Sequence, residues 1–187
     1  YAMNDELAAQ YDIDALALDG NYRTQVPMPL MGTFGSILTW FTSDEAVVDE
    51  TGKVTQPNYV EGNQRVTLTA VTDKNGFSGQ KYFELLIAAK NNYVALAKKS
   101  FEQESGSISA TLDLQNHTQE EQQMMLVLAG YDGGEMSGVD CKVVTLSAGQ
   151  TLAGVSLSSA CTADRVEVYL WSMEQQPVDR MTLLNAG

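Results

Sequence analysis

Carboxylates are the first side chains to consider for chemistry, since the sequence has 24 Asp and Glu residues but a single histidine. Adjacent carboxylate pairs include those at 44–45, 49–50 and 120–121. Two converging carboxylates are the machinery of a glycosidase. Adjacent residues of a strand point to opposite faces of the sheet, however, and in turns they are solvated. These pairs therefore predict no catalytic site.

The only histidine, His117, follows Asn116 in a polar turn and has no evident partner as a general base. A general base needs such a partner within hydrogen-bonding reach. The sequence also has no Gly-rich phosphate loop that leads into a helix. We therefore expect no enzyme activity, no catalytic residues and no cofactor.

The two cysteines, Cys141 and Cys161, lie too far apart in sequence for the close Cys pairs of zinc sites. No loop has the Asp/Asn spacing of an EF-hand either, so we expect no bound metal. If the chain is exported, Cys141 and Cys161 are a possible disulfide. Two free thiols are the alternative, and the sequence leaves both open.

Exposed aromatic rings beside polar side chains are the usual basis of sugar binding, because pyranose rings stack on them. Tyr59 and Phe77 lie in predicted turns, and Trp171 ends a predicted strand, so these three are the possible glycan-binding residues. Trp40 and Phe83 lie on strands and are expected in the core. The remaining candidates have core explanations: Tyr22, Phe34, Tyr131 and Tyr169.

The elements that position these residues are almost all strands. A short helix is expected near the start, with Asn4 or Asp5 as its N-cap and good helix formers after it. From there hydrophobicity follows a period of two. The expected strands are 37–41, 46–48, 53–55, 65–72, 81–88, 107–115, 123–131, 142–146, 151–157 and 165–171, with a Pro-interrupted edge segment at 26–30.

Short strands at regular spacing, separated by turn signals such as Asn75–Gly76, are typical of antiparallel sandwiches. The sequence therefore predicts an all-β fold of two tandem antiparallel, Ig-like β-sandwiches with a short N-terminal helix. We place the domains at 1–92 and 93–187. The apolar stretch 93–97 is expected to pack between the domains or to begin the first strand of the second.

The formal net charge of −13 is spread over both halves. Such a surface repels phosphate backbones and anionic lipids, so we expect no nucleic-acid partner and no membrane insertion. No run of about 18 apolar residues occurs. The chain opens at Tyr1 without a signal peptide, and we expect it to be a monomeric piece of a longer polypeptide whose upstream domains are its partners.

Residues 12–90 resemble the atrophied bacterial immunoglobulin-like domains of secreted Gram-positive proteins. The resemblance rests on a composite pattern that includes Trp40, Gly52 and Pro57, with Phe41 where the family has a small polar residue. The stretches that carry it are 26–32, 37–40, 43–44, 47–48, 52–54, 66–70 and 81–83. It implies that Trp40 fills the space between two sheets.

The second half is similar, more loosely, to a small C-terminal β-sandwich module of the same kinds of protein, through residues 128–134 and 166–173. Both modules are typically appended to glycoside hydrolases and surface proteins, which implies a secreted or cell-surface location. We expect a non-catalytic accessory region that acts as a structural spacer for a neighbouring catalytic or adhesive domain. The alternatives are a carbohydrate-binding module, with polysaccharide or cell-wall glycan as partner, and a protein–protein or assembly module.

Overall fold

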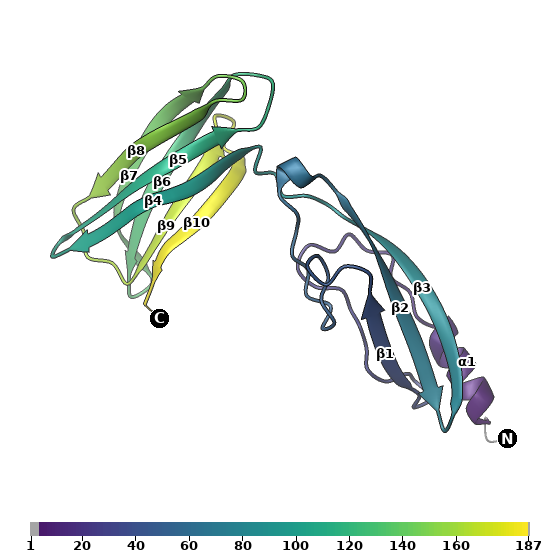
Figure 1. Ribbon diagram of the computed structural model, residues 1–187. Coiled ribbons are helices and arrows are strands. Elements are labelled where there is room, and N and C mark those ends of the chain that lie inside the picture. The colour runs from purple at the N-terminus through teal and green to yellow at the C-terminus, as the bar shows by residue number, and fades with distance from the viewer. Residues whose placement is uncertain (1–3, 187) are drawn as a thin grey trace. The chain divides into compact units, whose positions relative to one another are not determined.

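The computed structural model describes residues 4–186. The chain divides into two compact units, and the boundary along the sequence lies between Lys90 and Asn91 (Figure 1). Each unit has its own hydrophobic core. The fold is all-β with antiparallel sheets and one short N-terminal α-helix, as the sequence predicts.

The first unit begins with helix α1 (Asp5–Asp14), whose N-cap is Asn4: its Oδ1 accepts a hydrogen bond from the Leu7 backbone N–H at 2.8 Å. A three-stranded sheet follows in the order β1 (Ile37–Thr42), β2 (Gln64–Lys74) and β3 (Phe77–Ile87). A short 3₁₀ helix, η1 (Tyr59–Glu61), lies just before β2.

Alternation decides which face of this sheet is buried. In β2 the side chains of Val66, Leu68 and Ala70 are buried, and their neighbours in sequence point outward. Trp40 and Phe83 join this core with ring centroids 5.8 Å apart, which confirms their predicted core positions. The β2–β3 hairpin closes through Asn75–Gly76, both with positive φ, as a two-residue hairpin turn requires.

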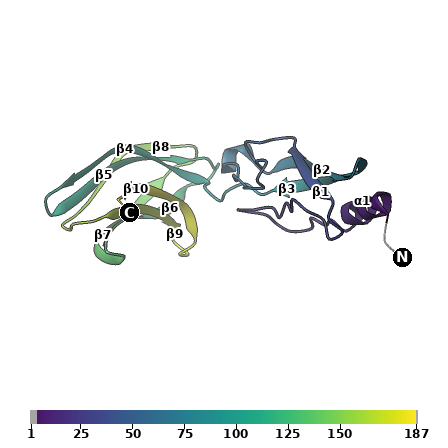
Figure 2. The same ribbon diagram turned by 90° about the horizontal axis from the view of Figure 1, so that it is seen from below.

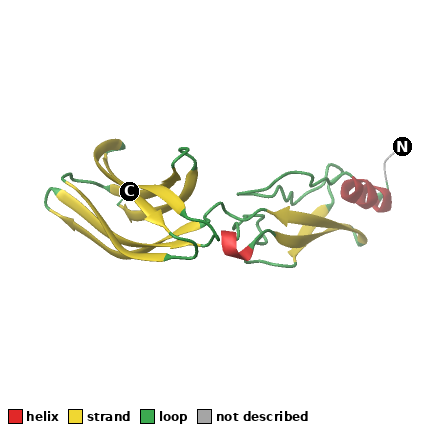
Figure 3. Cartoon of the chain, turned by 90° about the horizontal axis from the view of Figure 1, so that it is seen from above, coloured by secondary structure: helices red, strands yellow, loops and turns green. Residues whose placement is uncertain are grey.

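The layer opposite the sheet consists mostly of loops, together with α1 (Figure 3). The predicted strands 46–48 and 53–55 are wrong as strands, because only a single bridge, Val48 to Val54, joins them. The Pro-containing segment likewise makes only isolated bridges at its flanks, at Gln25 and Met31. Proline lacks the N–H that a regular ladder needs, which limits pairing here.

Core side chains and buried hydrogen bonds hold this loop layer in place. Val26 is buried, and its N–H donates to the Gly52 carbonyl at 2.7 Å. The indole N–H of Trp40 donates to the Pro29 carbonyl at 2.8 Å. Buried Asp12 of α1 accepts from the backbone N–H groups of Phe34 and Ser36, at 2.8 and 3.0 Å.

The second unit is a seven-stranded sandwich, and Figure 2 shows its two sheets as separate layers. One sheet has the order β4 (Val94–Glu104), β5 (Ser107–Asn116), β8 (Thr151–Ser159). The other has the order β10 (Pro177–Asn185), β9 (Arg165–Ser172), β6 (Gln122–Asp132), β7 (Glu135–Leu146). The inner faces of both sheets supply its core, including Leu112, Leu126 and Val168.

The sequence did not predict β10, and it predicted only the start of β4. The apolar residues of β10 do not alternate regularly with polar ones, and most of β4 is polar and exposed. The apolar stretch 93–97 does begin the first strand of the second unit, at Val94.

Candidate functional site

The three residues predicted for glycan binding do not form one platform. Tyr59 begins η1 and is 42% exposed, whereas Phe77 begins β3 and is 47% exposed. The 11 residues of β2 separate them, a distance of roughly 35 Å at the rise of an extended strand. Trp171 belongs to β9 of the other unit and is only partly exposed.

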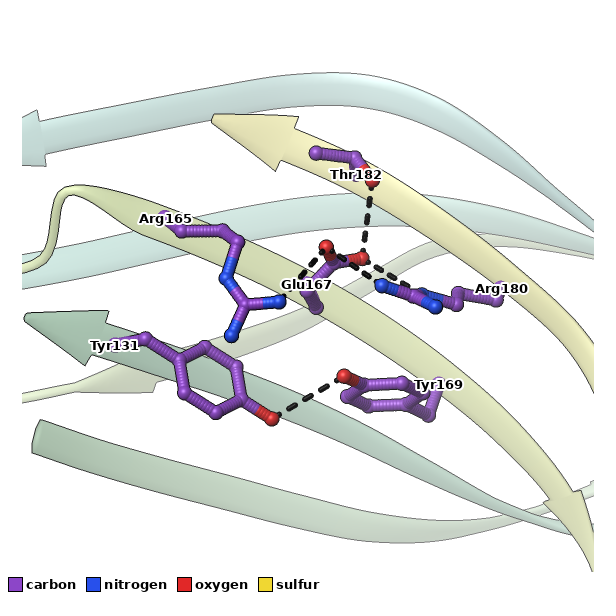
Figure 4. A network of polar contacts seen from close by, with 6 residues as sticks. All are labelled: Tyr131, Arg165, Glu167, Tyr169, Arg180 and Thr182. Carbon is purple, nitrogen blue, oxygen red and sulfur yellow. Dashed lines mark hydrogen bonds and ion pairs between the residues drawn. The ribbon is translucent and has the colours of Figure 1, made fainter. Parts of the chain in front are cut away.

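Trp171 lies instead on a face with its own polar network. Alternate residues of β9 point away from the core: Arg165, Glu167, Tyr169 and Trp171. Figure 4 shows how Glu167 is held from both sides. Arg180 of β10 donates to its carboxylate from Nε at 3.0 Å and Nη2 at 2.9 Å. The hydroxyl of Thr182 donates at 3.0 Å.

The tyrosines of this face are covered by arginines. The Tyr131 and Tyr169 hydroxyl oxygens lie 3.2 Å apart. The Arg165 guanidinium lies 4.0 Å from the centroid of the Tyr131 ring, and that of Arg180 lies 5.4 Å from the Tyr169 ring (Figure 4). Cation–π contacts of this kind occupy ring faces that a sugar would otherwise stack on.

The network fixes the charges of its members. Arg180 hydrogen bonds lower the pKa of Glu167 below its ordinary value, outweighing burial, which raises it; the Thr182 hydrogen bond lowers it further. The same pair raises the pKa of Arg180. The hydrogen bond with Tyr131, together with burial, raises the pKa of Tyr169. An ionised, fully paired carboxylate is suited to holding β9 to β10, not to transferring protons near neutral pH.

Sequence reasoning missed this network, because β10 was not expected as a strand. The signal present in the sequence was the alternation of aliphatic residues with polar or aromatic ones along 165–171. Without the neighbouring strand, nothing in that pattern assigns Arg180 and Thr182 to Glu167.

The other chemical candidates have local roles. Asp49 accepts hydrogen bonds from the Thr51 hydroxyl and from backbone N–H groups in its turn, and these lower its pKa despite some desolvation. The backbone N–H of His117 donates to the Tyr93 carbonyl at 2.9 Å. Within residues 4–186, no group of three or more His, Cys, Asp or Glu side chains is placed to hold a metal ion.

Both cysteines are free thiols in the structure. Cys161 is buried, and its Sγ lies near Gly130 and Gly138, where an added Cβ would come within 2.9 and 2.7 Å of it. Cys141 is exposed on β7 and is paired in register with Val127. The arrangement is that of the free-thiol alternative.

The sheet of the first unit, its core tryptophan and its loop layer define an immunoglobulin-like β domain that has lost much of its second sheet. Residues 5–90 match the family model described as the atrophied bacterial Ig domain. No curated protein matches the chain. The resemblance predicted for the first unit is therefore confirmed.

A match to this family indicates an accessory domain of a larger protein. Such domains are typically non-catalytic and often occur on extracellular proteins. None of the helices in residues 4–186 is long and apolar enough to cross a membrane.

Proposed function

We propose that this chain is a non-catalytic spacer of a secreted or cell-surface bacterial protein, which holds a neighbouring catalytic or adhesive domain at a distance. The observation that carries the proposal is the path of the backbone. In each unit the chain enters at one end of the long strands and leaves at the other. Units with this path extend a polypeptide, whereas a unit whose ends meet would return it to its starting point.

In the first unit, the chain enters through α1 beside the tip of the β2–β3 hairpin. The side-chain amide of Asn75 donates to Asp5 at 2.8 Å, and the Thr72 hydroxyl donates to the Ala9 carbonyl at 3.2 Å. The chain leaves after Ile87, which pairs with Gln64 at the opposite end of the hairpin.

In the second unit, β4 begins beside the start of β10, where the Leu96 N–H donates to Asp179 at 2.9 Å. Both strands then run to the other end of the sandwich (Figure 1). There, the Gln103 side-chain amide donates to the Ala163 carbonyl at 2.9 Å, and the Ala186 N–H donates to the Asp164 carbonyl at 2.8 Å. The chain therefore passes along the full length of this unit.

The connection between the units is short and anchored on both sides. Gln56 donates to the Ala88 carbonyl at 3.0 Å, and the Lys90 N–H donates to the Pro57 carbonyl at 2.8 Å. On the other side, the Tyr93 carbonyl accepts from His117. These bonds support a semi-rigid coupling, since a short anchored connection leaves few free dihedral angles.

The test is a pulsed EPR distance distribution between spin labels at Glu84→Cys and Gln115→Cys, two exposed strand positions in different units, in a Cys141→Ser background. A spacer gives one narrow distribution. Inserting Gly-Ser-Gly-Ser between Asn91 and Asn92 should broaden it. The same insertion between Gly133 and Gly134, in a hairpin turn of the second unit, is the control and should leave it unchanged. Equally broad distributions with and without the linker insertion would contradict a semi-rigid spacer.

A further inference from the structure

The outer face of the first unit's sheet carries two aromatic rings that the core does not use. Phe41 of β1 is 57% exposed and Tyr82 of β3 is 65% exposed. Each follows or precedes a core aromatic: Trp40 points inward and so directs Phe41 outward, and Phe83 does the same for Tyr82. An exposed ring is common, but two on one small sheet form a surface feature.

Strand register places these rings in a single row. Phe41 pairs with Thr69 of β2, and Thr69 pairs with Tyr82 of β3. The two rings therefore flank Thr69 across two strand spacings, roughly 9–10 Å. That separation is comparable to the length of a disaccharide, so the rings are placed to stack on alternate sugars of an extended chain running across the strands.

Hydroxyl and amide groups lie beside the rings. The next row of the same face consists of Thr39, Val71 and Gln80, paired across the three strands. The Gln80 side-chain amide donates a hydrogen bond to the Tyr82 hydroxyl, which orders that phenol on the surface. Groups that both donate and accept are what sugar hydroxyls need, while their C–H faces need the rings.

Charge selects the class of glycan. The two rows have no charged residue. The nearest charges on this face are both carboxylates, one row beyond on either side: Glu84, which is paired with Thr67, and Asp73, which is paired with Ile37 and Ser78. The chain as a whole has a formal net charge of −13. Anionic sugars would be repelled by this background, and no cation of the two rows would offset the repulsion. A neutral glycan is not repelled by this negative charge.

The second unit lacks an equivalent platform in the part of the chain that the structure describes. Its outward tyrosines, Tyr131 and Tyr169, face guanidinium groups, and Trp171 is partly buried beside Tyr169 with centroids 6.3 Å apart. Phe41 and Tyr82 have no such cover among the cation–π contacts of the described residues.

We propose that Phe41, Thr69 and Tyr82 form a binding strip for an extended, uncharged glycan. The strip is distinct from the predicted residues Tyr59, Phe77 and Trp171. It adds a binding activity to the spacer and does not depend on how the two units are coupled.

Affinity electrophoresis of the whole chain tests this proposal, in gels containing xyloglucan, mixed-linkage β-glucan, galactomannan, amylose or, as the anionic comparison, polygalacturonate. The wild-type chain should be retarded by at least one neutral polymer and not by polygalacturonate. Phe41→Ala and Tyr82→Ala should each weaken binding roughly tenfold or more, the loss expected when a central contact is removed. Tyr82→Phe keeps the ring and should retain most of the binding.

Phe77→Ala is the matched control, because it removes an exposed ring of the same unit away from the strip. Its binding should equal that of the wild type, and all variants should unfold at similar temperatures because the changed side chains are exposed. Absence of retardation in every neutral gel would overturn the proposal. So would retardation by polygalacturonate alone, or equal loss in Phe77→Ala. Concentration-dependent dimerisation lost in Phe41→Ala would overturn it in favour of a self-association surface.

Discussion

At the scale of single residues, the best-defined interaction of the second unit is the buried carboxylate of Glu167. It is 2% exposed and accepts hydrogen bonds from the Arg180 guanidinium and the Thr182 hydroxyl. Only the Glu167 side of the pair is buried, since the Arg180 side chain is 57% exposed. Removing Arg180 or Thr182 would leave the buried carboxylate with unmet hydrogen bonds, which costs more than the contact itself contributes. The Glu167–Arg180 pair therefore joins β10 to β9, whether or not it adds to the net stability of the fold.

We expect Glu167→Gln to lower the free energy of unfolding of the second unit by about 1–3 kcal/mol, from the loss of charge-assisted hydrogen bonds. Urea denaturation at neutral pH measures this, with the exposed Glu174→Gln as control. The pKa of Glu167 is depressed in the folded state, so its contribution is fully present above the ordinary value of 4.5 and is lost as pH falls through the folded-state pKa. The difference between wild type and variant should therefore shrink in acid; a difference that grows would contradict the pairing.

The two thiols should differ sharply in reactivity. Cys141 is exposed, so iodoacetamide should alkylate it in the native protein, whereas buried Cys161 should react only after unfolding. Intact mass should show one added group in the native protein and two in guanidinium. No added group under either condition without reductant would instead reveal a disulfide.

At the scale of elements, the loop layer of the first unit depends on glycine at one tight contact. Gly52 has φ +83°, and a Cβ there would lie 2.4 Å from the Val26 carbonyl oxygen. Since Val26 is a core residue of this layer, the clash would displace the segment that covers the sheet.

Gly52→Ala should therefore destabilise the first unit by more than backbone strain alone, by about 2–4 kcal/mol in total. Gly76→Ala is the matched control, because Gly76 has φ +90° with no atom within 4 Å of an added Cβ. Thermal unfolding of both variants separates the clash from the strain. Equal losses in the two would show that the Val26 contact does not matter.

Alternation of apolar residues predicted most central strands, since it reports directly which face of a strand is buried. It failed for β10, whose apolar residues do not alternate regularly, and for most of β4, whose side chains are largely polar and exposed. It wrongly predicted strands at residues 46–48 and 53–55. The apolar side chains there are buried, but they belong to loops and not to a ladder of paired strands. The local apolar pattern predicts which side chains are buried. It does not predict hydrogen-bonded pairing, because pairing depends on a neighbouring strand elsewhere in the sequence.

The candidate binding residues show the same limit. Tyr59 and Phe77 are predicted as glycan-binding residues because turns expose side chains, and both side chains are exposed. The sequence did not predict Phe41 and Tyr82 as binding residues. The inward positions of Trp40 and Phe83 nevertheless imply that Phe41 and Tyr82, next to them in the chain, face outward. What the sequence alone lacked was the register that brings Phe41 and Tyr82 into one row.

At the scale of the whole molecule, two β units in succession each carry the backbone from one end of their strands to the other. This path and the short anchored connection are the features of the backbone that a spacer requires. The glycan strip is a separate property of one outer sheet face.

The most direct test of the spacer is the separation of the two ends of the second unit. Spin labels at Gln115→Cys, beside the start of β4, and at Asn185→Cys, at the end of β10, in a Cys141→Ser background report it by pulsed EPR. The account predicts a single distance of about 25–40 Å, set by the length of the strands. A distance below about 15 Å, less than five residues of extended strand, would mean that the chain returns to its starting point and would contradict the spacer.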